Sequence, residues 1–345
     1  MIPFVPTFEA AKITIEEEAA VMKKTLVSGN HTRKIRLGIS SCLLGEKVRY
    51  DGAHKLDRFI TDTLGQYFEW IPVCPECEYG LPVPREPLRL VGRPESPRLI
   101  TIKTGIDHTE KMLQWTEKKL TELEQRNLCG FIFKSKSPSS GIAGVKVYKP
   151  SGVPSQRGVG IFGGAFMKRF PLTPVIDDVR LHNPQLRKNF IEGVCVFQRW
   201  QELLKSRDIN DLVGFHTSHK LLMLAHSPRH YALLGQLVAD AKGVKRKDLY
   251  ASYIQGFMEG MRLLATPAKN ANVLMRIAGY LKKFITADEK QELLEVIENY
   301  RQCLVPLIVP VTLVKHYARK YRIVYLEKQR YLNPHPVELM PQNHV

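Results

Sequence analysis

The 345 residues are 44% hydrophobic and 25% charged and carry a formal net charge of +17, a composition typical of a soluble globular protein long enough for two domains. No apolar run reaches the roughly 18–20 residues that a membrane helix needs. The acids Glu16, Glu17 and Glu18 stand where a signal peptide would have a basic flank and an apolar core, so we expect a cytoplasmic protein without a membrane segment.

The positive charge is spread along the chain. A protein this basic is attracted to polyanions, and to nucleic acid above all. A generally cationic surface is the alternative that composition alone leaves open.

The six cysteines do not form the dense framework of a secreted disulfide protein. Three of them lie in apolar or helical contexts and should be buried as small hydrophobic side chains: Cys129, Cys195 and Cys303. The other three lie near Gly or Pro in turn-like sequence and are candidates for chemistry: Cys42, Cys74 and Cys77.

The first part of the chain alternates between strand and helix patterns. Residues 1–34 form an extension with a predicted helix over Glu9–Leu26. Ile35–Ser40 predicts a buried strand that runs directly into Ser41-Cys42. Asp57–Phe68 predicts an amphipathic helix, and Trp70–Val73 predicts a second short strand that ends at Cys74.

Further along, Thr109–Gln125 predicts a helix capped by Thr109, and Gly130–Phe133 predicts a third strand. The serine-rich loop Lys134–Gly141 follows that strand. Gly158–Gly164 lacks the sequence context of a phosphate-binding loop and predicts a tight turn. Strands alternating with helices predict an α/β domain with a parallel sheet, and ligands bind beyond the carboxyl ends of such strands.

This α/β domain should cover residues 35–204 and end in a helix over Leu186–Leu204, followed by a polar linker at 205–211. Residues 212–345 show few strand signals and predict an all-α domain of about five helices. The predicted helices are Lys220–Leu237 (with a break at Pro228), Lys247–Leu264, Asn272–Phe284, Asp288–Gln302 and Pro310–Tyr321.

Three segments that follow predicted strands carry candidate ligands: Cys42, Cys74 and the serine loop. Cys74-Pro-Glu-Cys77 is a single CxxC, which is ambiguous between a redox pair, half of a zinc site and chance. The residues alone therefore predict a cysteine-ligated metal site at the edge of the sheet and leave the metal open.

Several motifs occur in the order of a known family. They are Ser40-Ser-Cys-Leu-Leu-Gly45, Val48-Arg-Tyr-Asp-Gly52, Cys74-Pro-Glu76, Gly80-Leu-Pro-Val-Pro-Arg85 and Ser137-Pro-Ser-Ser-Gly141. This set resembles the thiouracil desulfidase (TudS) family. Beyond residue 212 the chain resembles the helical YbgA-like domain, through Phe215-His-Thr-Ser-His-Lys-Leu-Leu-Met-Leu-Ala-His226 and Val305-Pro-Leu-Ile-Val-Pro310. The fused pair is similar to the RudS type of tRNA 4-thiouridine desulfidase.

The resemblance implies a 4Fe-4S cluster held by three cysteines, with one iron left open. Thiolates suit such clusters, and an open iron is a Lewis acid that accepts a soft sulfur atom. The implied reaction is non-redox: water replaces the sulfur of a thiopyrimidine by oxygen and sulfide leaves.

The chain departs from the family at one implied ligand. Cys42 and Cys74 match two cluster cysteines, but Ser140 stands where the Ser-Pro-Ser-Cys-Gly motif has the third. A hydroxyl oxygen is a poor substitute for a thiolate. The cluster could be weak or lost, Cys77 could replace the missing ligand, or Ser140 itself could ligate. We favour the first, because a loop built for one ligand position rarely accepts another.

The catalytic candidates are Glu76, Ser137 and Asp51. Glu76, beside Cys74, is expected to be the acid/base group for the water, and pairing with Arg85 or capping a turn is its structural alternative. Ser137, with Ser139, could donate to the cluster or substrate or cap a turn around Pro138.

Two further sets have open roles. Basic residues predicted to bind RNA are Arg49, Lys134, Lys136, Lys220, Arg229, Lys245, Arg246, Lys282 and Lys283, with ion pairs or a solvated face as the alternative. His216, His219 and His226 fall near one helical face, where metal binding is possible but packing, capping or phosphate contact is favoured.

These observations predict an iron–sulfur-dependent desulfidase of 4-thiouridine in tRNA, with activity impaired by Ser140. We expect the sheet domain to carry out the chemistry and the helical domain to bind RNA. The nucleotide would have to leave its stack to react. The alternatives are a non-catalytic tRNA-binding protein that lost its cluster and a desulfidase of free thiouracil. The expected partner is tRNA, with no membrane and no obligate protein partner.

Overall fold

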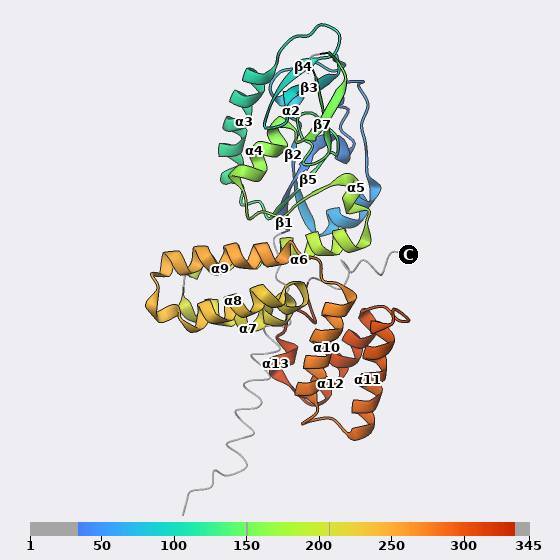
Figure 1. Cartoon of the computed structure of the whole chain (residues 1–345), viewed down its shortest axis with the longest axis vertical. Coiled ribbons are helices and arrows are strands. Elements are labelled where there is room, and N and C mark those ends of the chain that lie inside the picture. The colour runs from blue at the N-terminus through green and yellow to red at the C-terminus, as the bar shows by residue number, and fades with distance from the viewer. Residues whose placement is uncertain (1–33, 150, 207, 335–345) are drawn as a thin grey trace, which may run out of the picture. The chain divides into compact units, whose positions relative to one another are not determined.

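The computed structural model describes residues 34–149, 151–206 and 208–334, and its contacts divide the chain into units Met1–Lys34 and Ile35–Val345. Apart from Lys34, the predicted N-terminal extension lies outside the described residues. The second unit begins with two sheets and their helices and continues as a helical region, which confirms the predicted fold class (Figure 1). None of the helices in the described part of the chain is both long and apolar enough to cross a membrane.

The first sheet is parallel and has the strand order β2-β1-β5-β8. Its strands are β1 (Ile35–Ser40), β2 (Phe68–Val73), β5 (Gly130–Phe133) and β8 (Val175–Asp177). β1 and β5 have the predicted bounds. All four strand ends therefore lie at one edge of the sheet, as expected for a parallel sheet.

Both faces of this sheet are covered, which explains its continuous apolar strands. On one face, Phe131 and Phe133 pack with α3 (Thr109–Glu124) and α4 (Ile161–Arg169). On the other face, Ile132 shares a core with the π-helix η2 (Phe59–Thr63) and α6 (Pro184–Ser206). Alternate residues of β5 thus point into two different cores.

The sequence did not predict the second sheet, which has the order β4-β3-β6-β7. Its strands are β3 (Leu88–Arg93), β4 (Ser96–Thr101), β6 (Val145–Tyr148) and β7 (Pro154–Gly158). Only part of each strand is apolar and buried, for example Leu90 and Leu99, which pack against Met112 of α3. Charged residues at the intervening positions hide such strands from a search for apolar runs.

Three local predictions differ from the structure, the first of them only in helix type and length. The segment Asp57–Phe68 holds η2 and the 3-10 helix η3 (Leu64–Gln66), and Phe68 already opens β2. Thr109 is not the N-cap of α3, a position that His108 takes; the Thr109 hydroxyl bonds to Asp107 Oδ1 instead.

The predicted tight turn at Gly158–Gly164 is also wrong, because its second half forms the start of α4. A Cβ atom on Gly160 would lie 2.5 Å from the Ser139 carbonyl oxygen, and one on Gly163 would lie 2.6 Å from that of Ser140. These glycines let α4 approach the serine loop closely.

The C-terminal part is helical, with more helices than the five predicted. They are α7 (Ile209–His226), α8 (Pro228–Ala239), η4 (Ala241–Gly243), α9 (Arg246–Met261), α10 (Pro267–Leu281), α11 (Ala287–Arg301), α12 (Ile308–Lys320) and α13 (Val324–Glu327). The predicted break at Pro228 is confirmed, since Ser227 caps α8 through the His230 amide.

Helix α6 contributes to two cores. Phe190 and Val194 pack in the core of the first sheet, whereas Trp200 and Leu203 pack in the core of the helical part. Of the predicted linker 205–211, residues 205 and 206 belong to α6, and α7 begins at Ile209. One continuous helix therefore joins the sheet part to the helical part.

We expect Gly163→Ala to lower the free energy of unfolding by about 1–3 kcal/mol, because the added methyl group would overlap a backbone oxygen. Urea unfolding followed by circular dichroism measures this. The control is Gly235→Ala in α8, where a Cβ atom meets nothing within 4 Å and should stabilise by about 0.5–1 kcal/mol. Equal effects of the two substitutions would contradict the close approach.

Candidate active site

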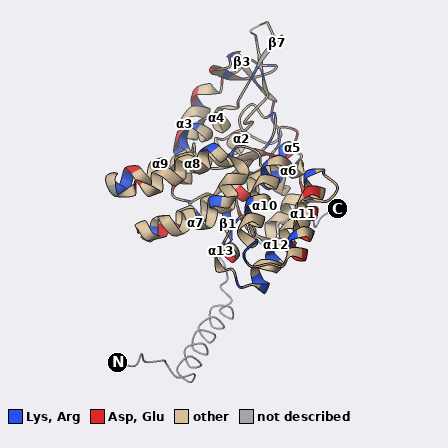
Figure 2. Ribbon diagram, turned by 60° about the horizontal axis from the view of Figure 1, so that its bottom comes forward, with Lys and Arg blue, Asp and Glu red and all other residues tan. Residues whose placement is uncertain are grey.

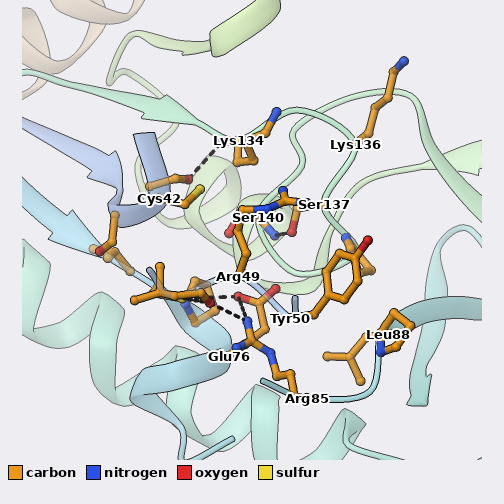
Figure 3. A pocket seen from close by; sticks show the side chains of 18 of the residues that line it. Cys42, Arg49, Tyr50, Glu76, Arg85, Leu88, Lys134, Lys136, Ser137 and Ser140 are labelled. Carbon is orange, nitrogen blue, oxygen red and sulfur yellow. Dashed lines mark hydrogen bonds and ion pairs between the residues drawn. The ribbon is translucent and has the colours of Figure 1, made fainter. Parts of the chain in front are cut away.

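The carboxyl ends of β1, β2 and β5 surround a cavity of about 220 Å³ (Figure 3). Cys42, Cys74 and Ser140 all line it, together with Glu76 and Arg85. The structure thus brings together the three predicted ligand positions, which lie 32 and 66 residues apart along the chain.

Both cavity cysteines are positioned by strand ends. Cys42 lies in the 3-10 helix η1 (Ser41–Leu44) directly after β1, and Cys74 is the N-cap of the short helix α2 (Pro75–Glu78) directly after β2. Burial raises the pKa of Cys42 to about 11 and also raises the pKa of Cys74. Both thiols are therefore protonated at neutral pH, and metal binding would release their protons.

Ser140 is held by its backbone. Its amide donates a hydrogen bond to Ser137 Oγ at 3.1 Å, and the residue as a whole is 4% exposed. Within the described part of the chain its hydroxyl makes no hydrogen bond, and it borders the cavity beside Ser137 (Figure 3). A hydroxyl that borders the cavity and has no hydrogen-bond partner in this part of the chain is consistent with a ligand position.

The carboxylate of Glu76 is fixed on both oxygens. The buried Ser139 hydroxyl donates to Oε1. Arg85 Nη2 lies 3.9 Å from Oε2, and Cys74 Sγ lies 3.6 Å from the same atom. The pairing with Arg85 that was the alternative role for Glu76 is therefore present, yet the carboxylate still borders the cavity.

Cys77 and Cys74 both place their sulfur atoms near the Val48 carbonyl oxygen, but only Cys74 lines the cavity. The Cys77 Sγ atom lies 3.4 Å from the Val48 carbonyl oxygen and accepts a hydrogen bond from Arg85 Nη1 at 3.5 Å. It does not appear among the residues that line the cavity. To replace the missing ligand it would have to leave both contacts.

Two family models match the chain. One, described as 2-thiouracil desulfurase, matches residues 37–178, and the other, described as a protein of unknown function (DUF1722), matches residues 220–336. The first range contains all the residues of the cavity described above.

Two curated proteins are similar to separate parts of the chain. The uncharacterized protein YbbK of Bacillus subtilis (strain 168) is 32% identical over 108 residues, which are 30% of this chain and 71% of YbbK. The uncharacterized protein YbgA of Escherichia coli (strain K12) is 36% identical over 126 residues, which are 36% of this chain and 75% of YbgA. The chain belongs to the 2-thiouracil desulfurase family. Its C-terminal part is a YbgA-like (DUF1722) domain.

A solved structure, described as the [4Fe-4S]-dependent thiouracil desulfidase TudS, is also similar. It has 28% sequence identity and a TM-score of 0.36, and the match covers 44% of this chain and 95% of that one. Membership of the desulfurase family makes the protein an enzyme of the class that cleaves carbon–sulfur bonds.

The remaining residues predicted near the desulfurase site take different positions. Asp51 is exposed, accepts hydrogen bonds from Arg49 and the Ala53 amide, and does not appear among the cavity-lining residues. Arg49 lines the cavity, and so does Ser137, whose hydroxyl bonds to Ser139. Lys136 also lines the cavity and is exposed.

The residues predicted to bind RNA do not form one cluster. Figure 2 shows Lys and Arg on the sheet part as well as on the helices. Lys220 is on α7, Arg229 is on α8, and Lys245 and Arg246 begin α9. Lys282 and Lys283 are exposed at the end of α10.

The three histidines of α7 have separate partners. His219 is buried and its Nδ1 bonds to the Phe215 carbonyl oxygen at 2.8 Å. His226 lies 3.2 Å from Glu192, and His216 bonds to the Tyr253 hydroxyl at 3.2 Å. The packing role expected for them is the one observed.

The sequence did not reveal Asp178, at the start of α5 (Asp178–Leu181). It forms an ion pair with Lys134 at 2.6 Å and accepts from the Ser135 amide at 2.7 Å, so it holds the start of the serine loop. The only sequence signal is the short run Val175-Ile176 followed by two aspartates. This pairing is the structural alternative to an RNA contact for Lys134.

The donors in the cavity match an iron–sulfur cluster at two of three positions. Cys42 and Cys74 provide the soft thiolates that such a cluster prefers, and Ser140 provides a harder oxygen at the third. The residues present therefore fit a cluster, but with a weaker third ligand than a cysteine.

We expect Asp178→Asn to lower the free energy of unfolding by about 1–3 kcal/mol at neutral pH, because it leaves the Lys134 ammonium without its partner. Burial alone would raise the pKa of Asp178, but the hydrogen bonds from Lys134 and the Ser135 amide outweigh it and lower the pKa. A lowered pKa stabilises the fold above the ordinary value of about 3.9, and this contribution is lost as the pH falls through the folded-state pKa.

The difference between wild type and variant should therefore shrink in acid. Urea unfolding at neutral and acidic pH measures it, with the exposed Asp240→Asn as control. A difference that does not change with pH would contradict the ion pair.

Proposed function

We propose that the protein removes sulfur from 4-thiouridine in tRNA by hydrolysis, using an iron–sulfur cluster that Cys42 and Cys74 hold weakly because Ser140 replaces the third cysteine. The meeting of these side chains with Glu76 at one cavity carries the proposal. When bound, such a cluster supplies an iron that accepts a thiocarbonyl sulfur as a Lewis acid.

The chain's own residues account for the proton transfer. Water attacks the ring carbon that bears sulfur, its oxygen becomes the new carbonyl oxygen, and the sulfur leaves as sulfide. No electron is gained or lost. Glu76, oriented by Ser139 and Arg85, takes the proton from the water at Oε2, the oxygen that faces Cys74.

The size of the cavity supports a single base as the reacting group. Its volume of about 220 Å³ is below the roughly 300–1,000 Å³ of sites for drug-sized ligands. A base within tRNA would have to flip out of its stack to enter. The net charge of +17 favours an RNA substrate over a free base, because it adds attraction to phosphates.

We expect Ser140→Cys to raise the iron content and the turnover of anaerobically reconstituted protein. Mutation of residues that only hydrogen-bond to metal ligands alters metal affinity or activity by about 10–100-fold. Replacing the ligand atom itself should therefore change iron content and turnover by about tenfold or more. Iron and sulfide analysis and the absorbance of thiolated tRNA measure the two effects.

The matched controls are two other cysteines. Cys303 is exposed, contrary to the burial expected from sequence, so Cys303→Ser should change neither quantity. Cys77→Ser should remove iron only if Cys77 has become a ligand.

If wild-type protein holds no iron but binds tRNA, and Ser140→Cys gains both iron and turnover, the natural chain is an RNA-binding protein without a cluster. If both proteins stay inert on thiolated tRNA and convert free thiouracil, the substrate assignment is wrong.

We expect Glu76→Gln to lower turnover by about 10²–10⁴-fold in a protein that retains its iron, because the amide still accepts from Ser139 but cannot take a proton. Single-turnover assays with thiolated tRNA measure the loss in the Ser140→Cys background. Glu46→Gln, an exposed position outside the cavity, is the control. Full activity of Glu76→Gln would assign the proton transfer to another group.

A further inference from the structure

One stretch of the helical part is basic and contains no acid. From Gly260 to Ala287 there is no Asp or Glu, and the cations are Arg262, Lys269, Arg276, Lys282 and Lys283. Helix α10 lies within this stretch and exposes one side, formed by Asn272, Met275, Arg276, Gly279, Tyr280 and Lys283. The spacing of three and four residues makes this a continuous helical face.

Aromatic rings from neighbouring elements extend this face. The Tyr280 ring lies 5.2 Å from that of Tyr325 on α13 and 6.0 Å from that of Phe284. Tyr280 is 42% exposed and Phe284 is 45% exposed, so both rings offer free area to solvent. Large aromatic side chains exposed together on a soluble protein indicate a binding surface.

The cations of this region lie over rings and not beside carboxylates. Lys220 Nζ is 4.9 Å from the centre of the Tyr325 ring, and the Arg276 guanidinium is 5.3 Å from that of Tyr231. Within the described residues neither cation forms an ion pair. On the adjoining helices, by contrast, Lys320 is paired with Glu289 at 2.6 Å. The charges over the rings thus remain available to a ligand.

We name this surface the aromatic–basic face: Lys220, Tyr231, Arg276, Tyr280, Phe284 and Tyr325. Its residues come from α7, α8, α10 and α13, with Phe284 just after α10 (Figure 1). We propose that it binds unpaired nucleotides of an RNA, with bases stacked on Tyr280 and Phe284 and phosphates near Arg276, Lys282 and Lys283. The proposal rests on the tRNA substrate proposed above and deepens it.

The chemistry of the face favours RNA over a protein partner. Single-stranded nucleic acid is held by aromatic rings that stack on bases and by cations that follow the backbone. The carboxylates of an acidic protein partner could pair with the cations but would not stack on the exposed rings. A nucleotide offers a phosphate for the cations and a base for the rings. Gly279 lies next to Tyr280 on this face. A Cβ atom at this position would meet nothing within 4 Å, so the packing of α10 does not require a glycine here. A glycine inside an exposed helix costs about 1 kcal/mol relative to alanine, and it leaves a flat approach to the ring.

The test measures RNA binding and does not depend on the cluster or on turnover. Fluorescence anisotropy compares a short labelled single-stranded RNA with the duplex of the same sequence. We expect Tyr280→Ala and Phe284→Ala each to weaken single-strand binding by about five- to hundredfold, the effect of losing one stacked base, and to leave duplex binding close to wild type. Tyr280→Phe keeps the ring and should bind like wild type. Leu304→Ala, at a side chain 68% exposed elsewhere, is the control for loss of exposed apolar surface.

The salt dependence separates stacking from charge. Lys282→Ala and Lys283→Ala should each reduce the slope of log affinity against log salt by about 0.7, whereas Tyr280→Ala should leave the slope unchanged. Circular dichroism checks that each variant is folded.

Unchanged single-strand affinity in the Tyr280→Ala/Phe284→Ala double variant overturns the proposal, and so does an equal loss for single strand and duplex. A wild-type dimer that the double variant dissociates, with RNA affinity unchanged, assigns the face to a second copy and also overturns it. If the protein binds RNA through these rings but never desulfurates tRNA, the inference stands and the proposed function fails.

Discussion

The parallel register of the first sheet is the constraint on which the site depends. Ser40 of β1 pairs with Val73 of β2, and Phe133 of β5 pairs with Asp177 of β8. Each strand thus ends at the same level, and its next residues enter the same cavity or anchor its wall. A slip of one residue would exchange the two buried faces of a strand, which the different cores on either side do not permit. The cores of the sheet therefore determine where the ligands lie.

The position of Ser140 is fixed by a second constraint, the contact between the serine loop and α4. The amides of Gly160, Ile161 and Gly163 donate to carbonyl oxygens of the loop at 2.7, 3.2 and 3.1 Å. The glycines leave no room for the loop to shift toward the helix. Loop movement therefore cannot repair a missing ligand, and the chemistry at this position depends on which atom residue 140 carries. In the proposed site, a change of one atom from sulfur to oxygen should therefore affect the cluster more than it affects the fold.

The sequence predicted the features that depend on contiguous residues. The fully buried strand Gly130–Phe133 is apolar throughout, and the family resemblance placed Cys42, Cys74 and Ser140 together. The features that it missed depend on distant partners. Asp178 matters only because Lys134, 44 residues earlier, lies beside it. The glycines of Gly158–Gly164 resemble a turn, yet they serve a contact with a loop about 20 residues away. The aromatic–basic face combines rings from several helices, so no window of the sequence contains it.

Helix α6 connects the sheet part and the helical part through their cores. Its first half is packed in the core of the desulfurase sheet and its second half in the core of the helical domain, and Phe197 contacts both. A helix buried at both ends bends little, because bending would open one core or the other.

Only part of the net charge of +17 is available to a ligand, since cations such as Lys134 and Arg169 already form ion pairs within the protein. Non-specific attraction is therefore weaker than the charge suggests. Under the proposed function, affinity for RNA would come from places where cations are unpaired and rings are exposed, whereas the cavity would recognise only the single base that carries sulfur.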